Sequence, residues 1–207
     1  MAVATKPIAC IVDDDDAIRD ALAWLLKSRG VPSRSWESGE AFLADYSPDL
    51  RGCLILDVRM GGMSGAELFE ELLARNCPLP VIFLTGHGDV PLAVTALKKG
   101  AFDFVEKPFN DNELVDRVLR AMEADATKQA ARATSAEIET RTAQLTSRER
   151  EVMELIVAGL YNKVIADRLG IAVRTVEVHR ARVFEKMGVR TAVELVQLLK
   201  RTQRPTP

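Results

Sequence analysis

The 207-residue sequence predicts a five-stranded, doubly wound parallel sheet of the flavodoxin-like type (an α/β domain), followed by a small all-α domain of four helices. In the first 120 residues, short apolar runs alternate with amphipathic segments, whereas the last 64 residues contain helical patterns only. The charge divides at the same place, because residues 1–143 carry a formal net charge of −7 and residues 144–207 one of +5. A basic tail is typical of a domain that binds a polyanion.

Five apolar runs are the predicted strands, at residues 8–12, 31–36, 53–56, 81–84 and 102–105. Three of them are almost continuously apolar, as expected for parallel strands that are covered on both faces. The clearest helical pattern between them begins near Ala17 and ends at Gly30, and another spans Ser64 to Arg75. We expect the strand order 2-1-3-4-5.

Three regions follow from this pattern: an α/β domain at 1–122, an interdomain linker at 123–143, and a helical domain at 144–207. The linker is rich in Ala, Thr and Glu and lacks an apolar stripe, so we expect it to be partly helical. The sequence has neither a signal-peptide pattern at its N-terminus nor an apolar run long enough to span a bilayer. We therefore expect a cytoplasmic protein that does not act at a membrane.

Polar side chains end four of the predicted strands. Asp13 and Asp14 follow the first strand, Asp57 the third, Thr85 the fourth and Lys107 the fifth. Ligands of an open doubly wound sheet bind at this edge, where the strand order reverses. Three carboxylates in one cleft repel each other unless a cation neutralises them, and Mg²⁺ (or Mn²⁺) prefers such oxygen ligands.

This arrangement predicts phosphoryl chemistry. Asp57 can attack a phosphoryl group and form an aspartyl-phosphate, while the Lys107 ammonium and the Thr85 hydroxyl contact the phosphoryl oxygens. Taken singly, each residue has a plainer explanation, since an Asp after a strand is often a helix cap or a solvated charge. Asp15 is interpreted in that way, as the N-cap of the first helix. The combination at one sheet edge favours a site.

The segments around these residues resemble the signature segments of receiver domains, in particular those of FixJ-type response regulators. The similar segments are Ile11–Asp15, Leu56–Met60, Met63–Gly65, Leu84–Asp89 and Phe104–Phe109. The resemblance implies that Asp57 is the phospho-acceptor, that Asp14 binds Mg²⁺ directly and Asp13 partly through water, and that the Arg59 backbone carbonyl is a further ligand. It also implies that Thr85 and Phe104 are the switch residues. Gly61 stands where the family usually has Pro, which predicts a looser loop beside the site.

The last 64 residues predict a helix-turn-helix. Capping-box patterns begin at Thr146 and Thr191, and a tight turn at Gly170 separates a short helix, 162–169, from a longer one, 173–187. The longer helix carries a face with few large apolar residues, formed by Arg174, Glu177, Val178 and Ala181, with Arg182 beside it. Such a face can enter a major groove, where Glu177 would contact a cytosine amino group and Val178 a thymine methyl.

Phosphate contacts, which position a domain without reading sequence, are expected from basic and amide side chains. The candidates are Asn162, Lys163, Arg174, Arg180 and Arg182. The segments Leu145–Val152, Asn162–Lys163, Leu169–Ile171 and Arg174–Arg180 resemble the NarL/LuxR-type DNA-binding domain, which adds Thr175 to the expected interface. The alternative is a four-helix protein-interaction module with a solvated charged face.

Together these features predict a response regulator that a sensor histidine kinase phosphorylates on Asp57. It is then expected to dimerise, to bind double-stranded promoter DNA and to activate transcription with RNA polymerase. It is not expected to be an enzyme beyond its own phosphorylation and dephosphorylation. The enzyme alternative, a haloacid-dehalogenase-like phosphohydrolase, needs a second Asp two residues after the nucleophile, where Arg59 stands. A flavodoxin-like FMN binder is disfavoured because the loop after the first strand is acidic.

Overall fold

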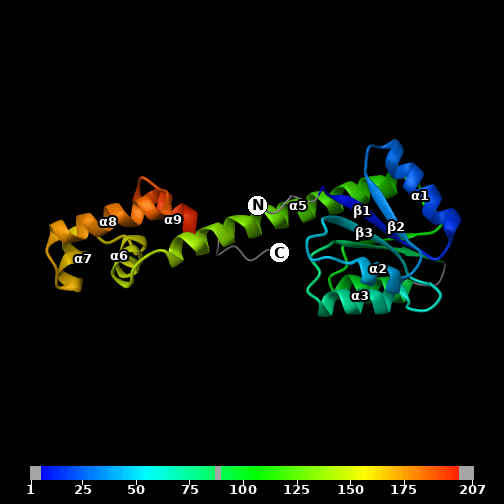
Figure 1. The fold of residues 1–207 in the computed structure, drawn as a ribbon, viewed down its shortest axis with the longest axis horizontal. Coiled ribbons are helices and arrows are strands. Elements are labelled where there is room, and N and C mark those ends of the chain that lie inside the picture. The colour runs from blue at the N-terminus through cyan, green and yellow to red at the C-terminus, as the bar shows by residue number, and fades with distance from the viewer. Residues whose placement is uncertain (1–5, 87–89, 201–207) are drawn as a thin grey trace. The chain divides into compact units, whose positions relative to one another are not determined.

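The computed structural model describes residues 6–86 and 90–200 of the chain (Figure 1). His87, Gly88 and Asp89, which belong to one of the similar segments, lie outside the described residues, as do the side chains of Val90 and Pro91. The chain divides into two compact units, residues 1–127 and 128–207.

The N-terminal unit is built on a parallel five-stranded sheet in the order β2-β1-β3-β4-β5, which confirms the predicted fold class and strand order. The strands are β1 (Ile8–Val12), β2 (Ser33–Trp36), β3 (Gly52–Asp57), β4 (Val81–Thr85) and β5 (Asp103–Glu106). β3 and β4 are buried along their whole length, as their continuous apolar runs predict.

Helices cover both faces of this sheet (Figure 1). They are α1 (Asp16–Ser28), α2 (Gly39–Asp45), α3 (Gly65–Ala74), α4 (Val90–Lys98) and α5 (Asp111–Ala143). Alternate residues of each strand point to opposite faces, so Ile55 packs in the cluster with α1 and α5, whereas Leu54 and Leu56 pack with α2 and α3. With both faces covered, the carboxyl ends of the strands are the edge at which such a sheet binds ligands.

Local sequence signals set the start of several helices. The Asp15 carboxylate accepts hydrogen bonds from the backbone N–H groups of Ala17 and Ile18, which confirms it as the N-cap of α1. Ser64 and Glu67 form a complete capping box at α3. These caps hold the loops that follow β1 and β3 next to the sheet edge.

The C-terminal unit contains four short helices around one apolar cluster, as expected. They are α6 (Ser147–Val157), α7 (Asn162–Leu169), α8 (Val173–Met187) and α9 (Ala192–Lys200). Gly170 adopts φ 62°, a left-handed conformation that suits glycine, and makes the tight turn between α7 and α8. Ala166 and Val176 are buried between these two helices, where a small side chain lets them approach closely. The α7–α8 pair has the connection of a helix-turn-helix.

The segment predicted as a partly helical linker is helical throughout, because α5 continues to Ala143. Its last turns belong to the C-terminal unit. Ile138 is 3% exposed and packs in the same apolar cluster as Val152 and Val183. Arg141 Nη1 donates a hydrogen bond of 2.7 Å to the carbonyl of Met187, at the C-terminal end of α8. The prediction missed this packing because one buried isoleucine makes no apolar stripe.

Glu149 is expected to make the stability of the C-terminal unit depend on pH under acidic conditions. Its side chain is 3% exposed and contacts Lys186 Nζ at 2.6 Å. The hydrogen bond from Lys186, with that from the Thr146 amide, lowers the pKa of Glu149 from 4.5 to about 2. Because the folded pKa is the lower one, this stabilisation is present above pH 4.5 and is lost as the pH falls toward 2.

Calorimetry of the full chain across this acidic range measures the effect. Glu149→Gln is expected to flatten the fall in stability of the C-terminal unit, whereas Glu151→Gln, at an exposed ion pair with Arg148, should keep the wild-type pH dependence. An unchanged pH dependence in Glu149→Gln would contradict the assignment.

Within the described part of the chain, no helix combines the length and the apolar character that a bilayer crossing requires.

Candidate functional site

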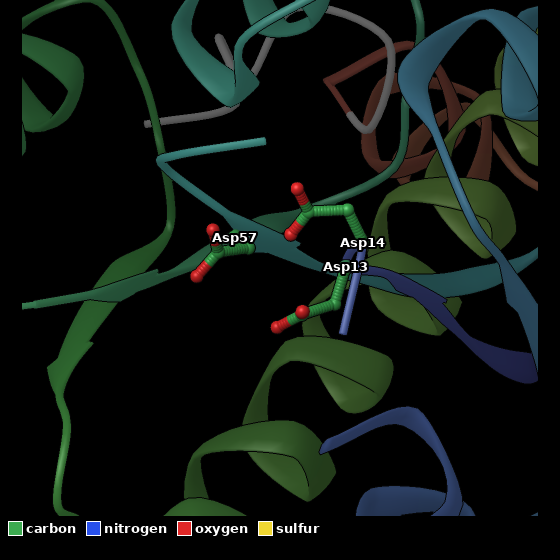
Figure 2. Close-up of side chains that lie close together, drawn as sticks. All are labelled: Asp13, Asp14 and Asp57. Atoms are coloured by element: carbon green, nitrogen blue, oxygen red, sulfur yellow. The ribbon is translucent and has the colours of Figure 1, made fainter. Parts of the chain in front are cut away.

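The polar residues that end the strands lie together at one edge of the sheet. Asp13 and Asp57 are buried, with 1% and 7% of their surface exposed, whereas Asp14 is exposed. One carboxylate oxygen from each of these three residues lies within 4.8 Å of the others. Figure 2 shows that the three side chains come from the ends of β1 and β3 and converge on one region. The sequence predicted this juxtaposition, and the structure contains it.

Lys107 connects the two buried carboxylates. Its Nζ lies 2.6 Å from Asp57 Oδ1 and 3.0 Å from Asp13 Oδ2. Burial lowers the pKa of Lys107, but its hydrogen bonds with the two aspartates raise the pKa more, so that it lies above its usual value. Lys107 therefore stays charged and offsets part of the negative charge of the cluster.

Asp57 has a raised pKa and a fixed orientation. Burial raises its pKa above the ordinary value, although the hydrogen bond and charge of Lys107 oppose that shift. Its second oxygen, Oδ2, accepts a hydrogen bond of 2.9 Å from the Arg59 amide. The two oxygens thus have different partners, which holds the carboxylate plane in one orientation at the end of β3.

Thr85 and Phe104 lie on the neighbouring strands β4 and β5. Thr85 is 1% exposed, and its carbonyl accepts a hydrogen bond of 2.7 Å from the Lys107 amide. Phe104 is half-buried and packs against the cluster on the α2–α3 face. The two residues therefore lie on strands that pair with each other.

Two glycines contribute to the site through their backbone. A Cβ at Gly65 would lie 2.0 Å from the carbonyl oxygen of Asp57, so only glycine lets α3 begin this close to the end of β3. The amide of Gly61 donates a hydrogen bond of 2.8 Å to Asp14 Oδ2. Gly65 was visible as part of a similar segment, but a backbone donor such as Gly61 leaves no sequence signal.

The residues predicted to contact DNA separate into two groups. The first group is exposed on α8 and includes Val178, with 46% of its surface exposed; its other members are Arg174, Thr175, Glu177, Ala181 and Arg182. The second group lines a groove between the start of α7 and α8, and consists of Asn162, Lys163 and Arg180. Arg180 is half-buried, with its guanidinium 5.1 Å from the ring centre of Phe184, so it lies beside the exposed face of α8 and not on it.

Tyr161 lines the same groove and was not among the predicted contacts. It is 82% exposed and supplies no side-chain cap to α7. Ala172 likewise supplies no side-chain cap to α8. The predicted helix α8 forms without that cap, because Val176, Val183 and Met187 are buried along it.

Comparisons with known proteins match both units. Residues 9–119 match the family model described as the response regulator receiver domain, and residues 143–199 match the model of bacterial regulatory proteins of the luxR family. The chain is 54% identical over 190 residues to the C4-dicarboxylate transport transcriptional regulatory protein DctR of Rhodobacter capsulatus, covering 91% of this chain and 96% of the relative. It is 48% identical over 188 residues to the transcriptional regulatory protein FixJ of Azorhizobium caulinodans, covering 91% of this chain and 89% of the relative.

Solved structures agree with these matches. The response regulator StyR has a TM-score of 0.87 at 41% identity, over 95% of this chain and 100% of that one. Full-length FixJ from B. japonicum has a TM-score of 0.60 at 43% identity, over 96% of this chain and 98% of that one.

Proposed function

Because the chain belongs to the response regulators that join a receiver domain to a LuxR-family DNA-binding domain, and so regulates transcription, we propose that Asp57 is its phospho-acceptor. The observation that carries the proposal is the position of Lys107 Nζ between Asp57 and Asp13, at the sheet edge where Asp14 also lies, after β1. This site supports phosphoryl transfer from a sensor histidine kinase. The two domains are proposed to span residues 1–122 and 144–207, with the linker at 123–143.

A divalent cation, Mg²⁺ or Mn²⁺, fits this donor set. Hard cations prefer carboxylate and carbonyl oxygens, and three carboxylates here offer one oxygen each within 4.8 Å. Asp14 and Asp57 would hold the ion directly, Asp13 partly through water, and the backbone carbonyl of Arg59 would complete the protein ligands. When bound, the ion supplies charge neutralisation for the phosphoryl oxygens.

The chain's own residues then perform the transfer. A carboxylate oxygen of Asp57 attacks the phosphorus of a phosphohistidine, the P–N bond breaks, and the imidazole leaves with the electron pair. Lys107 exchanges its contact with Asp57 for one with the new phosphoryl group. The Thr85 hydroxyl donates to another phosphoryl oxygen, and Phe104 follows by changing its side-chain orientation.

The kinase is proposed to dock on an apolar groove beside the acceptor site. The groove lies between α1 and the segment after β5, and its lining includes Ile18, Trp24, Leu25, Lys107 and Phe109. Trp24 is 73% exposed, although it is large and apolar. A phosphohistidine carried on a partner that covers this groove would approach Asp57 from the Lys107 side.

Trp24→Ala is expected to slow phosphoryl transfer from the cognate kinase about tenfold or more, because an exposed aromatic anchor often contributes 1.4 kcal/mol or more to an interface. Phosphorylation by acetyl phosphate, which needs no docking surface, should be unchanged. Radiolabel transfer from the kinase measures the first rate and intact mass the second. Leu73→Ala, at a 38% exposed leucine of α3 outside this groove, is the matched control. Equal kinase-dependent rates in wild type and Trp24→Ala would rule out this docking surface.

The C-terminal unit is proposed to read double-stranded promoter DNA in the major groove through α8. Exposed residues of α8 would face the bases and the nearby backbone. They are Arg174, Thr175, Glu177, Val178 and Ala181, with Arg182 beside them. Asn162, Lys163 and Arg180 would hold phosphates at the groove next to α7. DNA binding would take place in the cytoplasm, where the promoters are. Transcription activation would involve RNA polymerase.

Phosphorylation is proposed to favour a homodimer through the surface of α4 and β5. Leu92 and Phe102 are exposed there, at 48% and 37%. Two paired DNA-binding units on adjacent half-sites raise the effective concentration of each for its half-site. The enzyme alternative is not favoured, because Arg59 occupies the position at which a phosphohydrolase needs its second acid. The only reactions expected of the chain are its own phosphorylation and dephosphorylation.

A further inference from the structure

Tyr161 is exposed to a degree that the fold of its own unit does not explain. It is 82% exposed, more than any other large hydrophobic residue that the structure describes, and its side chain makes no cap hydrogen bond to α7. A tyrosine ring has a large apolar area, and burying it would stabilise the unit. The exposed ring and its hydroxyl are therefore available to a binding partner.

The backbone on both sides of Tyr161 is held by hydrogen bonds. Before it, at the end of α6, the amide of Leu160 donates to the carbonyl of Leu155 at 3.1 Å. After it, the amide of Ile165 donates to the carbonyl of Tyr161 at 3.0 Å, which is the first turn of α7. Only the two side-chain torsions of Tyr161 remain to be fixed, so a partner that orders this side chain costs it little conformational entropy.

The groove that Tyr161 lines carries positive charge. Two of its lining residues, Lys163 and Arg180, are basic, and none of the described lining residues is acidic. The Arg180 guanidinium lies 5.1 Å from the ring centre of Phe184, which holds this cation beside the groove. A concave surface with cations and no acid attracts a polyanion, and the unit that carries it matches a family of DNA-binding regulators. Charge complementarity therefore selects the DNA backbone as the occupant of this groove.

We propose that Tyr161 is a DNA-binding residue whose phenolic hydroxyl donates a hydrogen bond to a backbone phosphate. The inference rests on the proposed function, in which Asn162, Lys163 and Arg180 hold phosphates at the same groove. Tyrosine hydroxyls are among the groups that contact phosphate oxygens in protein–DNA complexes, and a hydrogen bond to a charged acceptor is stronger than a neutral one. Such a contact fixes the position of the domain on the duplex and reads no base.

A phenol differs from a cation in how its contribution to DNA affinity depends on salt. Lys163 and Arg180 neutralise phosphates, and the counterions that this releases make their contribution fall as the salt concentration rises. A phenolic donor carries no charge and releases no counterion. The contribution of Tyr161 is therefore retained at salt concentrations that weaken the contribution of the two cations.

Tyr161→Phe tests the proposal, because it removes the hydroxyl and keeps the ring. The side chain is 82% exposed, so the loss of one oxygen should leave the fold unchanged. The affinity for DNA should fall about tenfold per bound copy, as expected for one hydrogen bond to a charged group. This loss should be the same for a two-half-site DNA and a scrambled DNA, and the slope of log affinity against log salt concentration should keep its wild-type value. Fluorescence anisotropy of the full chain at several salt concentrations measures the affinities and the slope.

Two variants provide matched controls. Tyr46→Phe removes the hydroxyl of the chain's other tyrosine, in the N-terminal unit, and should bind DNA like wild type. Lys163→Ala removes a cation from the same groove, so it should lower the affinity and also reduce the slope by about one. An affinity loss with an unchanged slope in Tyr161→Phe, beside a loss with a reduced slope in Lys163→Ala, distinguishes the neutral contact from the charged one.

Chemical iodination of wild-type protein gives a second measurement that needs no variant. The exposed ring of Tyr161 should react readily in the free protein, and bound DNA should protect it. Tyr46, which is half-buried in the N-terminal unit, should react alike with and without DNA. Mass spectrometry of the two tyrosine-containing peptides measures the extent of each reaction.

Four outcomes would count against the proposal, and they differ in what they remove. Equal affinities of wild type and Tyr161→Phe would overturn the hydroxyl contact and leave the proposed DNA binding intact. A loss in Tyr161→Phe that comes with a reduced slope, or that differs between the two DNAs, would also overturn it, because the hydroxyl would not act as a neutral donor to the backbone. Iodination of Tyr161 that is equal with and without DNA would place the ring outside the interface and overturn it as well. Wild-type protein that binds neither DNA would overturn the proposed function and this inference with it.

Discussion

Replacing Asp57 with asparagine is expected to abolish phosphorylation completely. Wild-type protein incubated with acetyl phosphate and Mg²⁺ should gain one phosphoryl group, and Asp57→Asn should gain none. The amide of asparagine is not a nucleophile toward phosphorus, and it removes the charge that contacts Lys107 at 2.6 Å. Intact mass spectrometry of the two proteins measures the result.

An exposed carboxylate outside the cluster provides the control. Asp49 lies in the loop before β3, and its side chain is 86% exposed, so Asp49→Asn should be phosphorylated like wild type. An adduct that persists in Asp57→Asn would move the acceptor to another residue. An adduct lost in both variants would point to a general defect and not to the loss of the nucleophile.

Phosphorylated protein is expected to bind DNA with two half-sites about tenfold or more tightly than unmodified protein, since coupling between two sites is typically 5–150-fold. Phosphorylation can shift an equilibrium only by stabilising one state more than the other, and a dimer that pairs two DNA-binding units is the proposed state. Fluorescence anisotropy measures the affinity and sedimentation measures the self-association, each with and without acetyl phosphate.

Asp57→Asn treated with acetyl phosphate separates the effect of the modification from that of the reagent. Its DNA affinity should stay at the unmodified level. If wild type shows equal self-association and equal DNA affinity in both states, the chain contains two linked domains but no switch. A gain in affinity without dimerisation would leave the switch and exclude the proposed surface of α4 and β5.

Two substitutions distinguish base reading from backbone contact within the same experiment. Val178→Arg, on the exposed face of α8, should change which sequences are preferred. Lys163→Ala, at the groove beside α7, should weaken binding to all sequences. It should also reduce the slope of log affinity against log salt concentration by about one. A fragment for such work should begin near residue 128, because Ile138 and Arg141 pack on the C-terminal unit.

The fold class and most of the site were predictable because both depend on periodic or positional signals. Continuous apolar runs mark parallel strands, and a polar residue at the end of such a run must lie at the carboxyl edge of the sheet. Asp13, Asp57, Thr85 and Lys107 were placed together by this reasoning. Likewise, the capping pattern at Thr146 and the glycine at 170 predicted where helices begin and end.

The sequence by itself determined the order of the strands, the edge at which the acidic residues meet, and the helix whose exposed face is proposed to contact DNA. Only the tertiary structure decided that Lys107 bridges the carboxylates, that Arg180 lies in the groove with Lys163, and that Ile138 packs in the C-terminal cluster. The physical reason is the range of the interactions. Periodicity and capping act within a few residues of the chain, whereas the bond from Gly61 to Asp14 joins residues 47 positions apart through a backbone group that every residue except proline carries.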